Sequence, residues 1–276
     1  MTSAALPSNG NIATAAMARP AGFIDTLASE WSKLATLRAT HLTLGLGFLL
    51  SVATTAIGCI ALGMTQDDWS PDFSPITTSM IGVAFGLIVY TVFGVMVVSR
   101  EYASGTIRLT LTATPSRSRV FFAKLTLVTA TLLVIGLAST LGMFFVGQVL
   151  LGAYGMPTAS LADPDAARMV LGLGVVMPFF PVLGFAFGVL LRSTAGGITT
   201  ALGLLWLPQI FGQLVSDGFQ ENVLSFLPNN GVDTLTAGHI QHSPAFPDPL
   251  VGAVVAATWL AVIVGAALVA FLRRDA

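Results

Sequence analysis

Long apolar stretches alternate along this chain with short segments that hold most of its charged residues and turn formers. A helix needs about 20 apolar residues to cross the hydrocarbon core of a membrane. Stretches of about that length predict six transmembrane helices, at Leu42–Met64, Thr78–Ser99, Val120–Leu151, Met169–Leu191, Gly196–Val215 and Leu250–Leu272. The pattern therefore indicates an all-α membrane protein.

Prolines and glycines inside the apolar stretches predict local features of the helices. Pro178 and Pro181 should kink the fourth span, because neighbouring helices can re-satisfy the backbone at such a break. Two pairs of glycines lie four residues apart within spans, namely Gly82 with Gly86 and Gly184 with Gly188. Small residues at this spacing let another helix approach closely. That helix could belong to the same chain or to a second copy.

Composition indicates that the chain lies in a membrane, and the distribution of charge indicates how it is oriented there. Hydrophobic residues make up 54% of the chain and charged residues 9%, a balance that excludes a soluble domain of this length. Under the positive-inside rule, basic linkers lie on the cytoplasmic side. The segments expected there hold Lys33, Arg38, Arg100, Arg108, Arg117, Arg119, Lys124, Arg192, Arg273 and Arg274. The opposite linkers are acidic, with Arg168 as their one cation. We therefore expect a multi-pass protein of the cell membrane with both termini in the cytoplasm.

The segment before the first span divides into two parts. Residues 1–22 are rich in small and polar residues and predict a disordered cytoplasmic tail. Residues 23–40 predict an amphipathic helix at the membrane interface, with an apolar stripe of Ile24, Leu27, Trp31 and Leu34. Trp31, Lys33 and Arg38 suit the headgroup region. This helix could be only an anchor, or it could also contact a cytoplasmic partner.

The linker between spans two and three, at about residues 100–119, has a pattern of its own. Gly105 permits a tight turn, apolar residues follow it at Ile107, Leu109 and Leu111, and Pro115 ends the element before a basic re-entry. A short exposed cytoplasmic helix fits this pattern, and so does a solvated loop.

Two runs of residues resemble a known family. The run REYASGTIRLTLTATPSRSRVFFAKL resembles the cytoplasmic loop of ABC-2 type exporter permeases, and SEWSKLATLRAT resembles their N-terminal interface helix. The resemblance implies that residues 41–276 form a six-helix ABC-2 type transmembrane domain. It also implies that the loop carries a coupling helix resting on a nucleotide-binding subunit, with contact residues Arg100, Glu101, Tyr102, Gly105, Thr106 and Arg108. The family assembles two permease and two ATPase subunits, so the second permease would be another copy or a sister chain.

The outer linker at residues 217–249 is long for a simple connection. Its first half is apolar up to Pro228, and Asn229-Asn230-Gly231 follows. Related permeases place short re-entrant helices before the last span, and this half resembles one. A partly ordered surface loop is the alternative.

Several chemistries lack the residues that they need. A phosphate-binding loop ends in Gly-Lys-Ser or Gly-Lys-Thr, and neither lysine of the chain, Lys33 or Lys124, stands in that context. ATP and magnesium should therefore bind to a partner ATPase, and we expect no catalytic residue, metal or other cofactor in this chain. His239 and His242 have no third metal ligand in pattern. Nothing indicates a nucleic-acid partner.

An ion-coupled carrier needs ionisable groups at membrane depth, and the acidic residues fall in the linkers and the tail. The notable polar residues in or near spans are Gln148, Gln209 and Gln213, which could hydrogen-bond between helices or contact a substrate. The expected function is a permease subunit that exports an amphipathic or hydrophobic substrate, such as a drug or lipid, by alternating access. The alternative is a permease-like membrane anchor or sensor that transports nothing.

Overall fold

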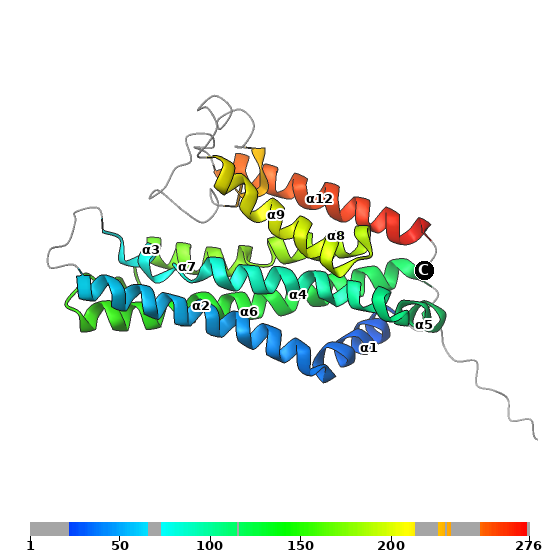
Figure 1. Cartoon of the computed structure of the whole chain (residues 1–276), viewed down its shortest axis with the longest axis horizontal. Coiled ribbons are helices and arrows are strands. Elements are labelled where there is room, and N and C mark those ends of the chain that lie inside the picture. The colour runs from blue at the N-terminus through cyan, green and yellow to red at the C-terminus, as the bar shows by residue number, and fades with distance from the viewer. Residues whose placement is uncertain are drawn as a thin grey trace, which may run out of the picture.

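The computed structural model describes residues 22–65, 73–114, 116–212, 226–229, 231–232 and 249–274, and within these ranges the regular structure is helical with no strand (Figure 1). Its helices are α1 (Phe23–Thr36), α2 (Arg38–Thr65), α3 (Pro75–Ser79), α4 (Val83–Ser104), α5 (Thr106–Ala113), α6 (Arg117–Ala153), α7 (Pro164–Val176), α8 (Phe179–Leu191), α9 (Thr194–Gly212) and α12 (Pro249–Arg273). The all-helical prediction is confirmed. The tail predicted to be disordered and most of the outer linker at 217–249 lie outside the described residues.

Five segments of the described chain are long and apolar enough to cross a membrane: Arg38–Thr65, Val83–Ser104, Arg117–Ala153, Pro164–Leu191 and Pro249–Arg273. They cover the predicted first, second, third, fourth and sixth spans. The predicted fifth span corresponds to α9, in which Thr194–Leu207 forms a shorter apolar helix. Since α9 reaches the edge of the described residues, the count of six spans stays a prediction.

The predicted second span is divided in the structure. The short helix α3 comes first, capped by the Ser74 hydroxyl, and α4 starts only at Val83. Thr55 on α2 stabilises this break. Its hydroxyl donates a hydrogen bond to the Ser79 carbonyl and accepts one from the Gly82 N–H, both at 3.2 Å. At its other end, α4 extends five residues further than the predicted span, to Ser104.

The predicted kink in the fourth span is present. Helix α7 ends at Val176 and α8 begins at Phe179, with Pro178 at the junction. Pro181 lies in the first turn of α8, where a missing N–H leaves no intrahelical hydrogen bond unmade. The segment thus crosses the protein as two helices with one proline-defined break.

The glycine pairs serve packing within the chain. A side chain at Gly184 or Gly188 would press on the backbone of α4, and one at Gly82 would overlap the Ser51 carbonyl on α2. Helix α8 lies in the centre of the bundle and is mostly buried, with α4, α9 and α12 around it. Of the two partners that the spacing left open, the structure supplies the intramolecular one.

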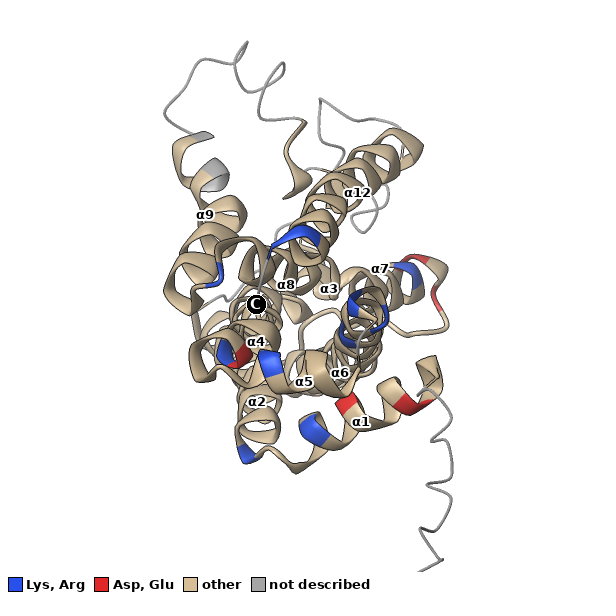
Figure 2. Ribbon diagram, turned by 90° about the vertical axis from the view of Figure 1, so that its right-hand side faces the viewer, with Lys and Arg blue, Asp and Glu red and all other residues tan. Residues whose placement is uncertain are grey.

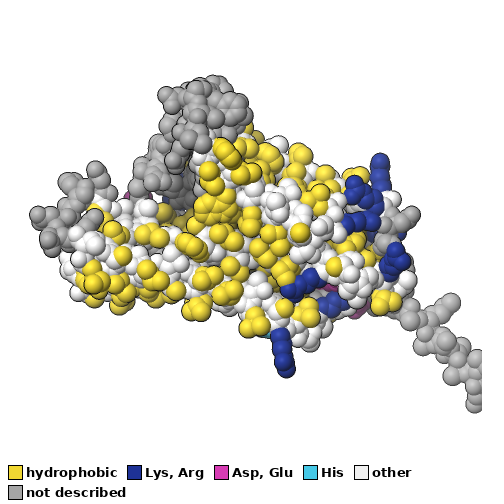
Figure 3. All heavy atoms as spheres, viewed as in Figure 1, with side chains coloured by type: hydrophobic (Ala, Val, Ile, Leu, Met, Phe, Trp, Pro, Cys, Tyr) yellow, Lys and Arg dark blue, Asp and Glu magenta, His cyan; other side chains and the backbone are white. Residues whose placement is uncertain are grey.

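The surface separates an apolar body from a charged end. Large apolar side chains are exposed along α2 and α12, including Leu42, Leu49, Val254 and Val262, as expected for helices facing lipid. Lysines and arginines gather at the end that holds α1, α5 and the C-terminal end of α12 (Figure 3). Figure 2 looks onto this end and shows acidic residues among the basic ones. Most of the charged residues of the described chain lie there.

Candidate functional site

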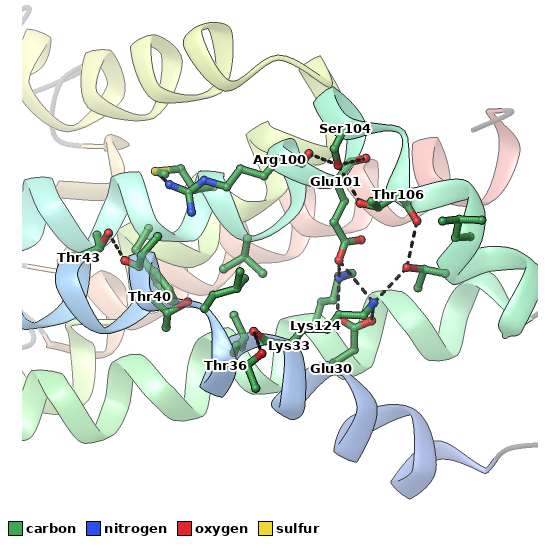
Figure 4. Close-up of a pocket in the computed structure, with 18 residues that line it drawn as sticks. Glu30, Lys33, Thr36, Thr40, Thr43, Arg100, Glu101, Ser104, Thr106 and Lys124 are labelled. Carbon is green, nitrogen blue, oxygen red and sulfur yellow. Dashed lines mark hydrogen bonds and ion pairs between the residues drawn. The ribbon is translucent and has the colours of Figure 1, made fainter.

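Four charged side chains from three helices meet at the charged end, and we call them the charge cluster: Glu30 and Lys33 on α1, Glu101 on α4 and Lys124 on α6 (Figure 4). Lys124 Nζ lies 2.5 Å from Glu30 Oε2 and 2.6 Å from Glu101 Oε1. Lys33 Nζ lies 2.7 Å from Glu30 Oε1 and 3.6 Å from Glu101 Oε1. Each ammonium therefore faces both carboxylates.

Burial makes this cluster costly to assemble unless it is fully paired. The Lys124 side chain is 2% exposed and the Glu30 side chain 5%, whereas Glu101 is 15% and Lys33 38% exposed. Removing charges from water costs several kcal/mol per ion, which only close opposite charges and hydrogen bonds offset. Two carboxylates against two ammonium groups leave the cluster formally neutral. Lys124 and Glu30, the two most buried members, thus form the centre of the cluster, and Lys33 forms its rim.

The spacing of residues along α1 places one of its faces, including Glu30, against the bundle. The Asp25 carboxylate accepts from the Gly22 N–H at 2.8 Å and so fixes the start of the helix. Thr26, Glu30 and Leu34 then follow at intervals of four and are the buried residues of α1. Ile24 and Trp31, of the predicted apolar stripe, are exposed, whereas Leu34 is buried in the main core.

The turn after α4 places the next helix, α5, beside the charge cluster. Gly105 has a left-handed φ of 70° and ends α4, and its N–H donates to the Tyr102 carbonyl. Helix α5 starts directly afterwards and buries Ile107 in the core. The Lys33 ammonium also donates to Thr110 Oγ1 at 3.0 Å, so the cluster holds α5 as well. The predicted tight turn and short helix both exist, and contact with an ATPase stays a prediction.

The predicted coupling residues do not all lie together. Glu101 belongs to the charge cluster, while the Tyr102 ring lies 5.0 Å below the Arg192 guanidinium that follows α8. Thr106 exchanges a hydrogen bond of 2.9 Å with Ser104. Arg100, Gly105 and Arg108 are exposed, as are Trp31 and Arg38 among the residues predicted for the interface helix.

The candidate substrate residues lie elsewhere. Gln148, toward the end of α6, donates to the Pro75 carbonyl at 3.2 Å and to Ser79 Oγ at 2.8 Å, and it accepts from the Ala159 N–H at 2.6 Å. Both of its donors thus serve the chain's own structure. The side chain of Gln209 and the whole of Gln213 lie outside the described residues.

Sequence reasoning missed the two most buried members of the cluster. The predicted apolar stripe of the interface helix does not include Glu30, and Lys124 is predicted above only as one of the basic residues on the cytoplasmic side. A signal existed, because Lys124 follows Phe121, Phe122 and Ala123 and precedes Leu125, and a lysine among apolar residues needs a buried anionic partner. Its partner could not be read from the sequence, since Glu30 and Lys124 are far apart along the chain.

A cavity of about 510 Å³ lies beside the cluster, between α1, the start of α2, the end of α4 and α5. Figure 4 shows the cluster at one end of this cavity and Thr40 and Thr43 at the other. No group of three or more His, Cys, Asp or Glu that could hold a metal ion occurs in the described ranges. The chemistry that this arrangement supports is ion pairing and mechanical linkage of helices.

Comparison with known proteins gives one result. The family model described as ABC-2 family transporter protein matches residues 9–276, which is nearly the whole chain. No curated protein matches.

Proposed function

Because the chain belongs to the ABC-2 family of transporter proteins, we propose that it is the permease subunit of an ATP-driven ABC exporter. It is an integral multi-pass membrane protein, and it would lie in the cell membrane with its charged end in the cytoplasm. A partner ATPase would bind ATP and magnesium there, and two permease subunits would work with two ATPase subunits. The exported substrate would be amphipathic or hydrophobic.

The charge cluster is the observation that carries this proposal. It links α1, α4, α5 and α6 by ion pairs and one further hydrogen bond, all at the same end of the bundle. A displacement of α5 would reach α1 through the hydrogen bond from Lys33 to Thr110, and the buried pairs of Lys124 would carry it to α4 and α6. An ATPase that closes beneath α5 could thus tilt the spans and alternate their access.

The surface of α5 supports a partner on this side. Ile107 anchors the helix in the core, whereas Leu109 is 70% exposed on the charged end of the protein. Leu109 thus gives α5 an apolar side chain that a partner subunit could cover. The basic residues around it support a cytoplasmic location by the positive-inside rule.

Glu101→Gln tests the coupling role directly. The change keeps the shape of the side chain and leaves Lys124 paired with Glu30, so we expect a stability loss of only about 1–3 kcal/mol. The complex with the ATPase should still assemble and reach the membrane, but transport per ATP hydrolysed should fall at least tenfold. The measurement is ATP-driven uptake into inverted vesicles, with hydrolysis followed in parallel.

Arg273→Gln is the matched control, since Arg273 is an exposed cation at the same end outside the cluster. It should transport like the wild type. Equal transport by Glu101→Gln and the wild type at equal membrane abundance would remove the cluster from coupling. A wild-type complex that hydrolyses ATP but moves none of a broad substrate panel would favour the anchor or sensor instead.

A further inference from the structure

The cavity beside the charge cluster exists because the chain bends there. Helix α1 ends at Thr36, Leu37 has an extended backbone, and α2 sets off in a new direction from Arg38. We call the resulting space of about 510 Å³ the elbow cavity. Figure 1 shows the bend, with α4 passing over it.

The walls of the elbow cavity are mainly apolar along its length. Leu34, Leu37, Phe93, Met96 and Val97 line it from α1, the elbow and α4. Such a wall can hold a hydrocarbon chain. A site for a purely polar ligand would not need it.

The cavity is lined by three basic side chains and two acidic ones. Glu30 and Glu101 are both engaged by Lys33 and Lys124, as described above. Arg100 also lines the cavity, and its guanidinium runs away from the carboxylates toward the far end (Figure 4). The one hydrogen bond found for that guanidinium among the described residues goes to Met96 Sδ at 3.7 Å, and a thioether is a weak acceptor. The cavity thus offers an arginine that lacks an anionic partner within the described chain.

The position of the cavity suits the headgroup layer of a membrane. It lies where the apolar spans meet the charged end (Figure 3), and the helices α1 and α2 that line it carry the exposed Trp31 and Arg38, which suit an interface. Basic pockets between membrane helices on the cytoplasmic side bind anionic lipid headgroups. An arginine also matches a phosphate with two parallel hydrogen bonds.

We infer that the elbow cavity is a binding site for one anionic phospholipid of the surrounding leaflet, with its phosphate on Arg100 and an acyl chain along the apolar wall. The inference relies on the proposed function only for the side of the membrane, because the lipid would bind whether or not the chain transports. A bound lipid would fill the space between the elbow and α4. The lipid composition of the leaflet would then affect the packing that holds α5 in place.

The test measures lipid retained by the purified full-length chain after reconstitution with equal amounts of phosphatidylglycerol and phosphatidylcholine, followed by detergent extraction and native mass spectrometry. We expect the wild type to retain phosphatidylglycerol over phosphatidylcholine by at least tenfold. Arg100→Gln should lose this preference, and Arg273→Gln should keep it. Ala39→Trp, which fills the cavity without changing charge, should reduce retention of both lipids.

Three outcomes overturn the inference. Equal retention of the two lipids by the wild type would show that the headgroup charge is not recognised. Retention by Arg100→Gln and Ala39→Trp at the wild-type level would place the lipid elsewhere. Loss of the lipid when the ATPase or a second copy binds would identify that protein as the occupant. A chain that transports nothing yet retains the lipid as expected would end the proposed function and leave this inference standing.

Discussion

Helix α6 carries a polar node near each of its ends, and the two nodes are built differently. At the charged end, Lys124 is held by two carboxylates from other helices. At the opposite end, Gln148 is held by neutral groups of α3 and of the segment that follows α6. At about 1.5 Å per residue the nodes lie roughly 36 Å apart, more than the hydrocarbon thickness of a membrane.

The difference concerns what happens when one partner is lost. A neutral node loses hydrogen bonds, each with a modest net contribution to stability. A charged node loses its neutrality, and the remaining buried charges repel one another. The charged node is therefore suited to respond to a force or a partner, whereas the neutral node is suited to fix the connection at its end.

The largest expected effect is all-or-none and tests whether the nodes lie on opposite sides of a membrane. Ala162→Cys lies in the exposed segment after α6, and Ala113→Cys at the exposed end of α5. In intact cells, an impermeant thiol reagent should label the first and not the second. The background is Cys59→Ala, because Cys59 is the one cysteine and is buried. Labelling of Ala113→Cys without permeabilisation would invert the proposed orientation.

The next largest effect is expected for Lys124→Met. This change leaves Glu30 and Glu101 buried with only the rim cation Lys33, at a cost of about 3–5 kcal/mol. Unfolding in mixed micelles with increasing denaturing detergent would measure it. Lys33→Met is the matched control and should cost less than half as much, since Lys33 is the most exposed member of the cluster. Equal losses would mean that burial does not set the cost.

Gln148→Leu should have a smaller effect, about 2 kcal/mol in the same assay. The Ala159 N–H would lose its acceptor, while the Ser79 hydroxyl would lose one donor and keep its hydrogen bond to the Pro75 carbonyl. No charge would be left unpaired. ATP-driven transport per folded molecule should stay at the wild-type level. A loss of transport at normal stability would give Gln148 a role in the substrate path.

The smallest effect is expected at the turn between α4 and α5. Gly105→Ala places a side chain at a left-handed φ of 70°, which costs about 1 kcal/mol, although no atom lies within 4 Å of the added carbon. Gly105→Asn should cost less, because asparagine tolerates this conformation. If alanine and asparagine behaved alike, the turn would not hold its left-handed conformation in the native protein.

Most of the fold follows from hydrophobic length alone. The ends of α6 and α12 lie within three residues of the predicted ones, because a charged or turn-forming residue follows each apolar run closely. The second span was displaced because Thr55 of another helix stabilises a break at Met80–Gly82. That hydrogen-bonding partner is distant in sequence, so periodicity could not reveal the break.

The candidate site was predictable only in part. Glu101 and Gly105 stood out by their place in a loop that resembles the family's, and the turn at Gly105 has the conformation that its type suggests. The predicted interface helix exists as α1, and its placement on the membrane stays a prediction. An apolar stripe predicts which face avoids water, and it cannot distinguish lipid from protein as the neighbour.

The sequence by itself determined the membrane as solvent, the helices, the turn after α4 and the gathering of basic residues in alternate linkers. These features depend on residue type and spacing over short distances, and the apolar runs are long enough to be unambiguous. Only the tertiary structure decided that Glu30, Lys33, Glu101 and Lys124 form one cluster and that Arg100 is left beside a cavity. Pairing of charges depends on distances between helices that are remote along the chain, and packing alone sets those distances.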